Sequence, residues 1–568
     1  MSNATTSSSA TSNSRLFARP ESWRWFSATL LIALIIALPV VSVFYLATES
    51  TENVWAHLAE TVLPVYVRTT LILMAGVGAL SLAIGVATAW LVTMCEFPFR
   101  RFFTWALMLP FAVPAYVIAY VYTDLLEYSG PVQIFLRELF GWQTARDYWF
   151  PDIRTLTGAI LMLALVLYPY VYLMARASFL EQSSSLRDAS RLLGCSAIGS
   201  FFKISLPIAR PAIAVGLALV AMETINDFGT VDYFAVRTLS AGIYDTWLNM
   251  GNIGGAAQIA SLMMIFVVSL ILLERAARRK QKQFNSLDRY KEEALFVLSP
   301  QRAYLSVLVC ALPVLLGFVV PVWVLADYAL DHLHQLVDER FLQHATHSFV
   351  LSAVAALCTI VLALILAYGK RLNPKSKGLN VMANFATLGY AMPGAVLAIG
   401  VIIPMAAFDN SLDAFLYDNF GISTGLLLSG TAFAVVFAYC VRFLAVSSGA
   451  IESSLNKVTP SMDMASRSLG HSPLTTLRKV HLPLIRGGIL SAALVVFVDC
   501  MKELPATLIL RPFNFDTLAT FVYQYASDEA IETSALAALL IVIVGVLPVI
   551  LLTRSISDTR SIKKAETP

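Results

Sequence analysis

Long apolar runs dominate the chain and recur with short polar segments between them. About twelve of these runs approach the roughly 20 residues that a helix needs to cross a bilayer. They begin near Ser27, Thr69, Phe103, Leu156, Ile208, Ala256, Tyr304, Phe349, Val381, Gly425, Leu484 and Ser534. The pattern predicts an all-α, polytopic integral membrane protein with about twelve transmembrane helices.

The charged residues divide the loops into two alternating sets. Lys and Arg gather in one set, most densely between residues 275 and 282 and between 554 and 564. Asp and Glu gather in the other set, for example at Glu49, Glu52 and Asp409. Because short basic loops remain in the cytoplasm, this alternation predicts an even number of spans with both termini cytoplasmic. The polar residues 1–25 are expected to be a disordered cytoplasmic segment.

Composition agrees with a lipid environment. Of the 568 residues, 58% are hydrophobic and 14% are charged, whereas soluble domains carry roughly 25% charged residues. Only the bilayer can serve as solvent for so much apolar surface. The net charge of +3 is too small to indicate a nucleic-acid partner. We expect the chain to be surrounded by membrane lipid because of its hydrophobic composition.

The chain contains a tandem repeat. The segment Ala189-Ser190-Arg191-Leu192-Leu193-Gly194 matches Ala465-Ser466-Arg467-Ser468-Leu469-Gly470 at an offset of 276 residues. Each glycine is followed, at the same distance, by a Leu-Pro pair, Leu206-Pro207 and Leu482-Pro483. The series predicts two six-helix units of the same orientation, at 26–274 and 303–553, joined by a cytoplasmic linker at 275–302 and followed by a cytoplasmic tail at 554–568.

Each copy of the repeated segment lies in a cytoplasmic loop between the fourth and fifth spans of its unit. The spacing predicts a short amphipathic helix, followed by an unwound stretch that ends at Leu-Pro, and such a helix can sit in a groove of another protein. A membrane-surface helix that merely connects two spans is the alternative. A connector has no need to repeat its spacing, so the recurrence favours a docking role.

The two loops resemble the "EAA…G…LP" loop of type I ABC importer permeases. In that family the loop is the coupling helix that docks in a cleft of the ATPase subunit. The resemblance implies this role for Asp188, Ala189, Gly194, Leu206, Pro207, Ala465, Gly470, Leu482 and Pro483. The first copy has Asp188 where the family has Glu. The second has Met464 there, with Asp463 one place earlier.

Fused twelve-span versions of this family resemble ferric-iron importer permeases and thiamin importer permeases. The runs from Asn226 to Val231, from Gly242 to Tyr244 and from Met501 to Thr507 are similar to the iron group. The resemblance implies a bacterial inner-membrane protein that works with two copies of an ATPase subunit and a substrate-binding protein. The sequence has no Gly-x-x-x-x-Gly-Lys-Ser/Thr loop to cradle phosphates. We therefore expect a channel without a catalytic site or bound cofactor, whose partner uses ATP and Mg.

The repeat also places acids at equivalent positions in the fifth span of each unit. Glu223 and Asp227 match Asp499 and Glu503 at the same offset of 276. Residues four apart share a helix face, so the four carboxylates are predicted to line a translocation path near its outer mouth. Ferric iron prefers oxygen ligands, and the four acids are thus candidate transient metal ligands, with phenols from Tyr233, Tyr244 and Tyr523 nearby.

Other interpretations remain open from the sequence. The four acids could instead cap helix ends or pair with Lys502 and Arg511. The cargo could be thiamin or another small solute, or the chain could be a secondary transporter driven by an ion gradient. Pro114 and Pro393 lie inside predicted spans and are expected to break the helical hydrogen-bond ladder there, either as hinges or as tolerated kinks.

Overall fold

The computed structural model describes residues 20–48, 54–182, 197–281, 295–374 and 376–565. The described part is almost entirely helical, and its two strands, β1 (Cys95–Glu96) and β2 (Phe296–Val297), form one short parallel pair. Eleven helices are long and apolar enough to cross a membrane, or up to twelve if one bent pair forms a single span. The prediction of an all-α, polytopic protein of about twelve spans is confirmed.

The first half contains five long helices and a third span built from shorter pieces. The long helices are α1 (Pro20–Thr48), α3 (Leu63–Met94), α7 (Leu156–Glu181), α10 (Leu206–Asn226) and α13 (Ile253–Gln281). The third span comprises α4 (Arg100–Ala106), the 3₁₀ turn η1 (Leu109–Ala112), α5 (Ala115–Leu126) and α6 (Pro131–Phe140). The shorter elements are α2 (Val54–Thr61), α9 (Ala197–Ser200), the π-helical turn η2 (Phe201–Ser205), α11 (Gly229–Tyr233), α12 (Leu239–Tyr244) and the π-helical turn η3 (Asp245–Asn249).

The second half repeats this order. Its spans are formed by α14 (Pro300–Val314) with the π-helical turn η4 (Leu315–Val319) and α15 (Val320–Asp331), then α16 (Glu339–Leu372), α17 (Lys377–Ala386) with η6 (Thr387–Ala391) and α18 (Gly394–Phe420), α19 (Ala432–Leu455), α22 (Leu482–Met501) and α25 (Ile531–Ala565). The shorter elements are η5 (Leu333–Val337), α20 (Pro460–Ser468), α21 (Pro473–Thr476), the π-helical turn η7 (Leu477–His481), α23 (Pro505–Leu510) and α24 (Leu518–Ser527).

The third span of each half is interrupted at its proline. Pro114 and Pro393 both have extended ψ values, 141° and 142°, and each immediately precedes a new helix, α5 or α18. A proline has no N–H to continue the ladder, and its fixed φ suits the start of a helix. In the first half the segments on either side of the break meet at 89°. The predicted kinks are therefore complete breaks.

The stretch before each Leu-Pro pair is helical, so the prediction that it is unwound is wrong. The turns η2 and η7 occupy equivalent positions, 276 residues apart, and run directly into α10 and α22. A proline ring clashes with the carbonyl four residues earlier in a regular α-helix. The wider π-helical turn relieves that clash, and the helices begin about ten residues before the predicted Ile208 and Leu484.

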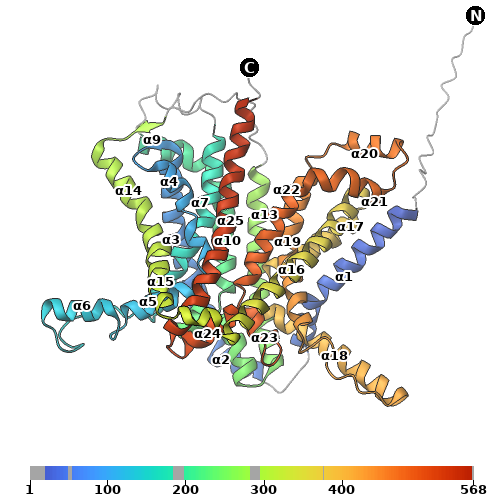
Figure 1. Ribbon diagram of the computed structural model, residues 1–568, viewed down its shortest axis with the longest axis horizontal. Coiled ribbons are helices and arrows are strands. Elements are labelled where there is room, and N and C mark those ends of the chain that lie inside the picture. The colour runs from blue at the N-terminus through green and yellow to red at the C-terminus, as the bar shows by residue number, and fades with distance from the viewer. Residues whose placement is uncertain (1–19, 49–53, 183–196, 282–294, 375, 566–568) are drawn as a thin grey trace, which may run out of the picture.

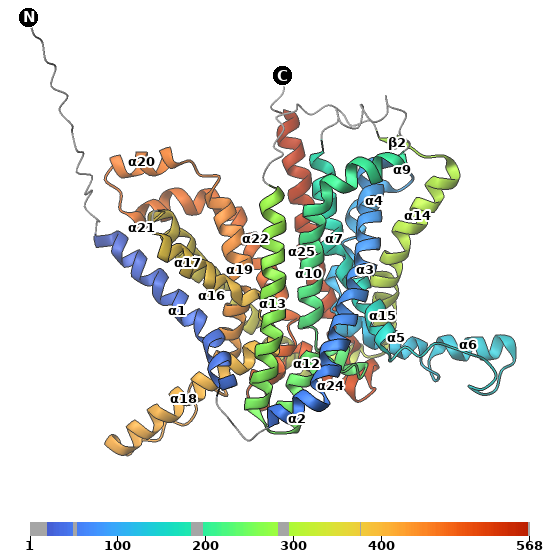
Figure 2. The same ribbon diagram turned by 180° about the vertical axis from the view of Figure 1, so that it is seen from behind.

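The two halves exchange their first helices. Helix α1 of the first half packs against α16, α17 and α18 of the second, and α14 packs against α3 and α4. One hydrophobic cluster combines residues of α3, α5 and α7 with residues of α15 and α25, and the other combines α1 and α13 with α16, α18 and α19. Each packed body therefore draws on both sequence repeats, as Figures 1 and 2 show from opposite sides.

The elements divide between two faces of the molecule. The helices α9 and α20, the N-terminal end of α1 and the C-terminal end of α25 lie at the top in Figure 1. At the bottom lie α2, α23 and α24, and Figure 2 shows α12 at the same level. Both ends of the described chain thus share a face with the repeated loop, as an even number of spans requires.

Candidate functional site: a central cavity and a repeated loop

The four predicted pathway carboxylates line a single cavity between the two halves. Glu223 lies near the C-terminal end of α10 and Asp227 follows that helix directly, while Asp499 and Glu503 lie at the matching end of α22. The cavity holds about 150 Å³. Residues 276 positions apart in sequence are thus brought to one place, as the repeat predicts.

Asp227 and Glu503 both cap the short helix that follows them. Asp227 Oδ1 accepts hydrogen bonds from the N–H groups of Thr230 (3.1 Å) and Val231 (3.2 Å). Glu503 accepts from the N–H groups of Ala506 (3.0 Å) and Thr507 (3.1 Å). Carboxylates are favoured at helix N-termini because they satisfy the free N–H groups there. The alternative interpretation, that the acids cap helix ends, describes these two residues.

Glu223 and Asp499 have fewer partners. Glu223 Oε1 accepts a hydrogen bond from the hydroxyl of Tyr390 (3.1 Å), which comes from η6 of the other half. Asp499 Oδ1 lies 3.0 Å from Lys502 Nζ, one turn later on the same chain segment. Neither carboxylate is recorded as capping a helix, so these are the two acids with the most freedom to contact a passing solute.

Two cations enter the cavity from the second half. Arg442 Nη1 lies 3.2 Å from Glu503 Oε1, and the two side chains are 11% and 2% exposed. Lys502 also lies over the ring of Phe111, with Nζ 4.6 Å from the centroid. At the matching positions the first half has Val166 and Asn226. The cavity therefore carries four acids and two bases, and its two walls differ in charge.

Sequence reasoning considered Lys502 but missed Arg442. The available signal was a guanidinium inside the otherwise apolar run that follows Gly425, since a charge within a span is costly and marks a cavity or an ion pair. The predicted partner Arg511 contacts Asp516 instead of any of the four acids.

The four acids do not form a ready-made metal site in this conformation. Among the described residues, no three His, Cys, Asp or Glu side chains are close enough together to hold one ion. The phenols also differ from those expected, because Tyr116, Tyr170 and Tyr390 line the cavity. The hydroxyls of Tyr244 and Tyr523 do not line the cavity. They donate instead to the Pro505 carbonyl and to Asp232. In this conformation the four acids are therefore not arranged as a preformed iron site.

Contacts between the halves lie beside the cavity at the face opposite α20. The Tyr244 hydroxyl of α12 donates to the Pro505 carbonyl of α23, and the Tyr523 hydroxyl of α24 donates to Asp232 Oδ2 at 2.5 Å. The ring of Phe228 stacks on Tyr244 with centroids 3.6 Å apart. Since the two hydroxyl contacts each pair a residue of one half with a residue of the other, they join the halves at this end of the molecule.

The second repeated loop contains the short helix that its motif predicts. Helix α20 (Pro460–Ser468) ends at Gly470, whose φ is +79°, and the His471 N–H bonds back to the Ser466 carbonyl at 3.2 Å. This is the left-handed helix ending that glycine favours. Ala465 and Met464 are exposed while Ser466 is buried. Leu482 and Pro483 open α22.

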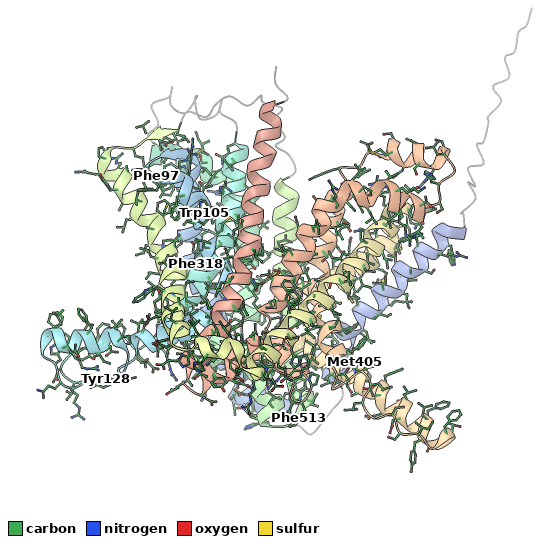
Figure 3. All side chains as sticks on the ribbon, viewed as in Figure 1. Phe97, Trp105, Tyr128, Phe318, Met405 and Phe513 are labelled. Atoms are coloured by element: carbon green, nitrogen blue, oxygen red, sulfur yellow. The ribbon has the colours of Figure 1, made fainter. Side chains whose placement is uncertain are left out.

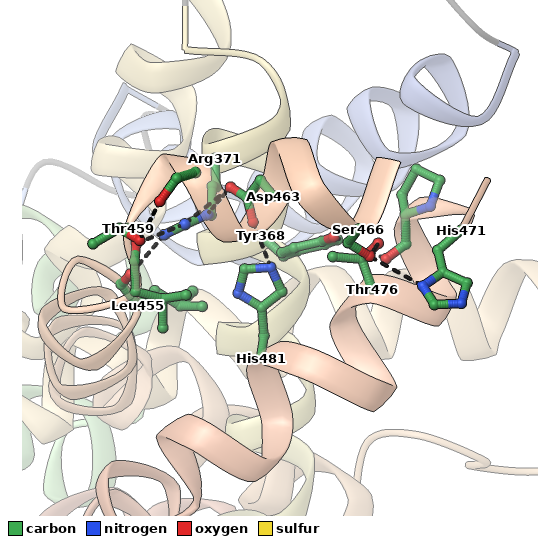
Figure 4. A network of polar contacts seen from close by, with 12 residues as sticks. Tyr368, Arg371, Leu455, Thr459, Asp463, Ser466, His471, Thr476 and His481 are labelled. Atoms are coloured by element: carbon green, nitrogen blue, oxygen red, sulfur yellow. Dashed lines mark hydrogen bonds and ion pairs between the residues drawn. The ribbon is translucent and has the colours of Figure 1, made fainter. Parts of the chain in front are cut away.

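A buried polar network fixes this loop to the membrane helices. Arg371, at the end of α16, donates from Nε to Asp463 Oδ2 of α20 at 2.9 Å. It also donates to the carbonyls of Leu455 (2.6 Å) and Val458 (2.8 Å). His481 Nε2 lies 2.8 Å from Asp463 Oδ1. Figure 4 shows Arg371, Asp463 and His481 converging from three helical segments.

The network explains the displaced acid of the second copy. Asp463 faces the chain's own arginine and histidine, and Met464 faces outward with 64% of its surface exposed. Arg187 and Ser205 stand 276 positions before Asp463 and His481, so the first half lacks this acid and this histidine. Asp188, Ala189 and Gly194 of the first loop lie outside the described residues, while Leu206 and Pro207 open α10.

These features define a class. Two tandem helical units of the same orientation, a charged cavity between them and a glycine-terminated loop at one face of the second unit, whose sequence motif recurs in the first, are typical of a membrane transport permease. Residues 81–283 and 359–560 both match the family described as binding-protein-dependent transport system inner membrane component. The chain belongs to that family, and it is a component of an ABC importer that also includes an ATPase and a substrate-binding protein.

Similar proteins extend over most of the chain. The chain is 26% identical over 549 residues to the Fe(3+)-transport system permease protein FbpB 2 of Haemophilus influenzae, covering 94% of this chain and 98% of that protein. The ferric transport system permease protein FbpB of Actinobacillus pleuropneumoniae is 23% identical, covering 94% and 78%. The molybdenum transport system permease protein ModB of Escherichia coli is 27% identical over 205 residues, which is 35% of this chain and 86% of that protein.

Proposed function

We propose that this chain is the permease of an ATP-driven ferric-iron importer in a bacterial inner membrane. The observation that carries the proposal is the cavity lined by Glu223, Asp227, Asp499 and Glu503 at the junction of the halves. The two similar proteins whose names specify ferric iron support the same cargo, because they match nearly the whole chain. The chain supplies the path, and ATP with Mg is used by the partner ATPase, without a catalytic site here.

The charge of the cavity suits a hard cation that must enter and leave. Oxygen ligands are the ones that ferric iron prefers. Conduction requires sites that bind strongly enough to admit an ion and weakly enough to release it. Glu223 and Asp499 meet this requirement as transient ligands, since Tyr390 and Lys502 are partners that a passing cation can displace. Asp227 and Glu503 shape the path while they cap α11 and α23.

The orientation follows from the basic loops. The face that holds α9, α20 and the ends of α1 and α25 is the cytoplasmic one in this proposal, in accord with its Lys and Arg content. Two copies of the ATPase subunit then dock there, one under each repeated loop. Asp188, Ala189 and Gly194 act in the first loop, and Ala465 and Gly470 act in the second.

The test is uptake of radiolabelled ferric iron into proteoliposomes with the ATPase, the binding protein and ATP. The variant Glu223→Gln with Asp499→Asn is expected to lower uptake by about tenfold or more, as expected from losing charge-assisted contacts of about 1.5–3 kcal/mol. The matched control is Asp331→Asn, an exposed acid at the end of α15. Unchanged uptake by the double variant would contradict a pathway role for the two acids.

The same assay separates the other functions. ATP-dependent uptake of thiamin or another small solute, without iron, would retain the permease and replace the cargo. Uptake driven by an ion gradient alone, without the ATPase, would identify a secondary transporter and would contradict the coupling role of the repeated loops.

A further inference from the structure

Each third span ends in an arm that leaves the body of the molecule. The first arm is α6 with the segment 141–152 that returns along it, and the second is Phe408–Phe420 of α18 with its return segment 421–430. Figures 1 and 2 show the two arms projecting in opposite directions at the face opposite α20. Tyr128 marks the base of the first arm in Figure 3, and Met405 lies on α18 before the second.

In the first arm, the return segment covers the polar side of the helix. Gln133 accepts a hydrogen bond from the Tyr148 hydroxyl at 2.5 Å, and Arg137 donates to that hydroxyl at 3.1 Å. The ring of Trp142 stacks on Tyr148 with centroids 4.7 Å apart. The turn between them is held by Asp147, whose pKa is lowered by backbone N–H groups of Thr144 and Gln143. Gln133 and Arg137 of α6 thus find partners within the arm.

The second arm reaches the same arrangement with other residues. Asp413 accepts from the N–H groups of Thr424 (2.6 Å) and Gly425 (3.0 Å) in the return segment. Asp409, which is 1% exposed, accepts from the N–H groups of Leu428 and Ser429. Two acids on one face of α18 therefore hold the return segment against the helix.

Large apolar side chains make up much of what each arm leaves uncovered, beside exposed polar residues such as Glu138 and Asp418. The exposed side chains include Phe135, Leu139 and Phe140 in the first arm and Phe415 and Phe420 in the second, each between 58% and 65% exposed. Trp149, on the return segment of the first arm, is 86% exposed. A helix that faces water normally shows the reverse pattern, with its polar side outward. The uncovered faces need an apolar or interfacial surrounding.

We propose that the two arms are membrane-interface anchors, whose aromatic faces rest among lipid head groups and upper acyl chains beside the spanning helices. The occupant is lipid because each arm continues a spanning segment sideways, so that its apolar face is continuous with the lipid-facing surface. Aromatic side chains favour this interfacial layer, and an amphipathic helix lying in its plane buries its apolar face there. The inference goes beyond the proposed cargo and depends only on the chain spanning a membrane.

The arrangement of the arms argues against the substrate-binding protein as the occupant. The helices α12, α23 and α24, which carry the contacts of Tyr244 and Tyr523 between the halves, lie between the two arms at the same face. A binding protein must deliver its cargo there, while the arms point away from it on opposite sides. The two arms are held together by different residues, a glutamine and an arginine in the first and two aspartates in the second. Both nevertheless expose large aromatic side chains.

The experiment places spin labels on the full-length protein with its ATPase in lipid nanodiscs. Leu139→Cys and Phe415→Cys probe the exposed faces of the two arms, and Arg146→Cys on the first return segment is the water-facing control. The unmodified protein gives the background from its native thiols, of which Cys95, Cys310, Cys440 and Cys500 are buried. Collision rates with oxygen, which partitions into lipid, are compared with those of a water-soluble nickel chelate.

We expect the oxygen-to-nickel collision ratio to be several-fold higher at Leu139 and Phe415 than at Arg146. A ratio at both positions equal to that of the control would place the arms in water and overturn the proposal. Nickel collisions that are frequent alone and fall only when the binding protein is added would overturn it in favour of a protein docking surface. Iron uptake is not measured in this experiment, so its outcome is independent of the proposed cargo.

Discussion

At the scale of single residues, Asp463 shows how a displaced acid acquires a different partner. In the second loop it is bound on one side by Arg371 and on the other by His481. The two ion-paired side chains, Arg371 and Asp463, are 16% and 20% exposed, so solvent screening is partial and removal of one member leaves the other poorly compensated. The pair therefore fixes the position of α20 relative to α16.

We expect Arg371→Met to uncouple transport from ATP hydrolysis. Loss of the ion pair and of two hydrogen bonds to loop carbonyls should weaken the attachment of α20 by about 1–3 kcal/mol. The measurement is the stimulation of ATPase activity by the loaded binding protein, together with co-purification of the ATPase. Stimulation should fall severalfold while the complex still assembles.

A double-mutant cycle separates this role from general destabilisation. Arg371→Met, Asp463→Asn and their combination should show a coupling energy of at least about 0.5 kcal/mol in thermal unfolding. Lys203→Met, at an exposed position in η2 of the first half, is the control for removing a charge near a loop. Strictly additive effects of the two substitutions would contradict a direct contact.

Sequence located the four cavity acids but not what each one does. The offset of 276 residues placed Glu223 with Asp499 and Asp227 with Glu503, because a repeat preserves position. Which acid accepts hydrogen bonds from backbone N–H groups depends on where the next helix begins. The sequence did not predict the helix breaks after α10 and α22 that precede α11 and α23. Arg442 was missed because its partner Glu503 is 61 residues away in sequence.

At the scale of elements, the short helices α12, α23 and α24 carry contacts that join the two halves beside the cavity. Their contacts depend on a few side chains, chiefly the hydroxyls of Tyr244 and Tyr523. Sequence proposed these tyrosines as iron ligands because they lie near the acids along the chain. It could not show that their hydroxyls are already occupied by protein acceptors from the opposite half.

The double variant Tyr244→Phe with Tyr523→Phe should loosen this end. Each hydroxyl hydrogen bond contributes about 1 kcal/mol. Without them, the conformation in which the halves are joined here should be less stable relative to one in which they separate. We expect basal ATPase activity, without binding protein, to rise by about fivefold for each 1.0 kcal/mol lost. The assay is ATP hydrolysis by the reconstituted complex in the absence of iron.

Tyr525→Phe is the matched control for this pair. It lies on the same helix α24, and its ring contacts Phe521. Its hydroxyl makes no hydrogen bond to the first half among the described residues. Basal activity of the control should equal that of the unmodified protein. If the double variant also retained normal basal activity, the two tyrosines would not contribute to joining the halves at this end.

At the scale of the whole molecule, the repeat predicted the number of spans but not how they pack. Six apolar helices per half follow from the spacing of the runs, and the even count follows from the basic loops. The helix that α1 packs against does not follow from the sequence, because an apolar helix face can pack equally well on several apolar neighbours. Close backbone approaches, visible only in the structure, select the partner.

Gly400 is one of these approaches, and it tests the exchange of first helices. A Cβ at this position of α18 would lie 2.3 Å from the Pro39 carbonyl oxygen of α1, which is closer than atoms can pack. Gly400→Ala should therefore separate the two helices at a cost of about 1–3 kcal/mol. The control is Gly487→Ala in α22, where a Cβ would meet nothing within 4 Å.

The effect should cross from one half of the chain to the other. If the chain is produced as two polypeptides divided in the linker between residues 281 and 295, the first half should co-purify with a tagged second half because α1 packs on α16, α17 and α18. Gly400→Ala in the second half should reduce this retention, while Gly487→Ala should not. Equal retention for both variants would contradict the prediction that the close approach of α1 and α18 helps to hold the halves together. Retention would then depend on the other contacts between the halves, such as those of α14 with α3 and α4.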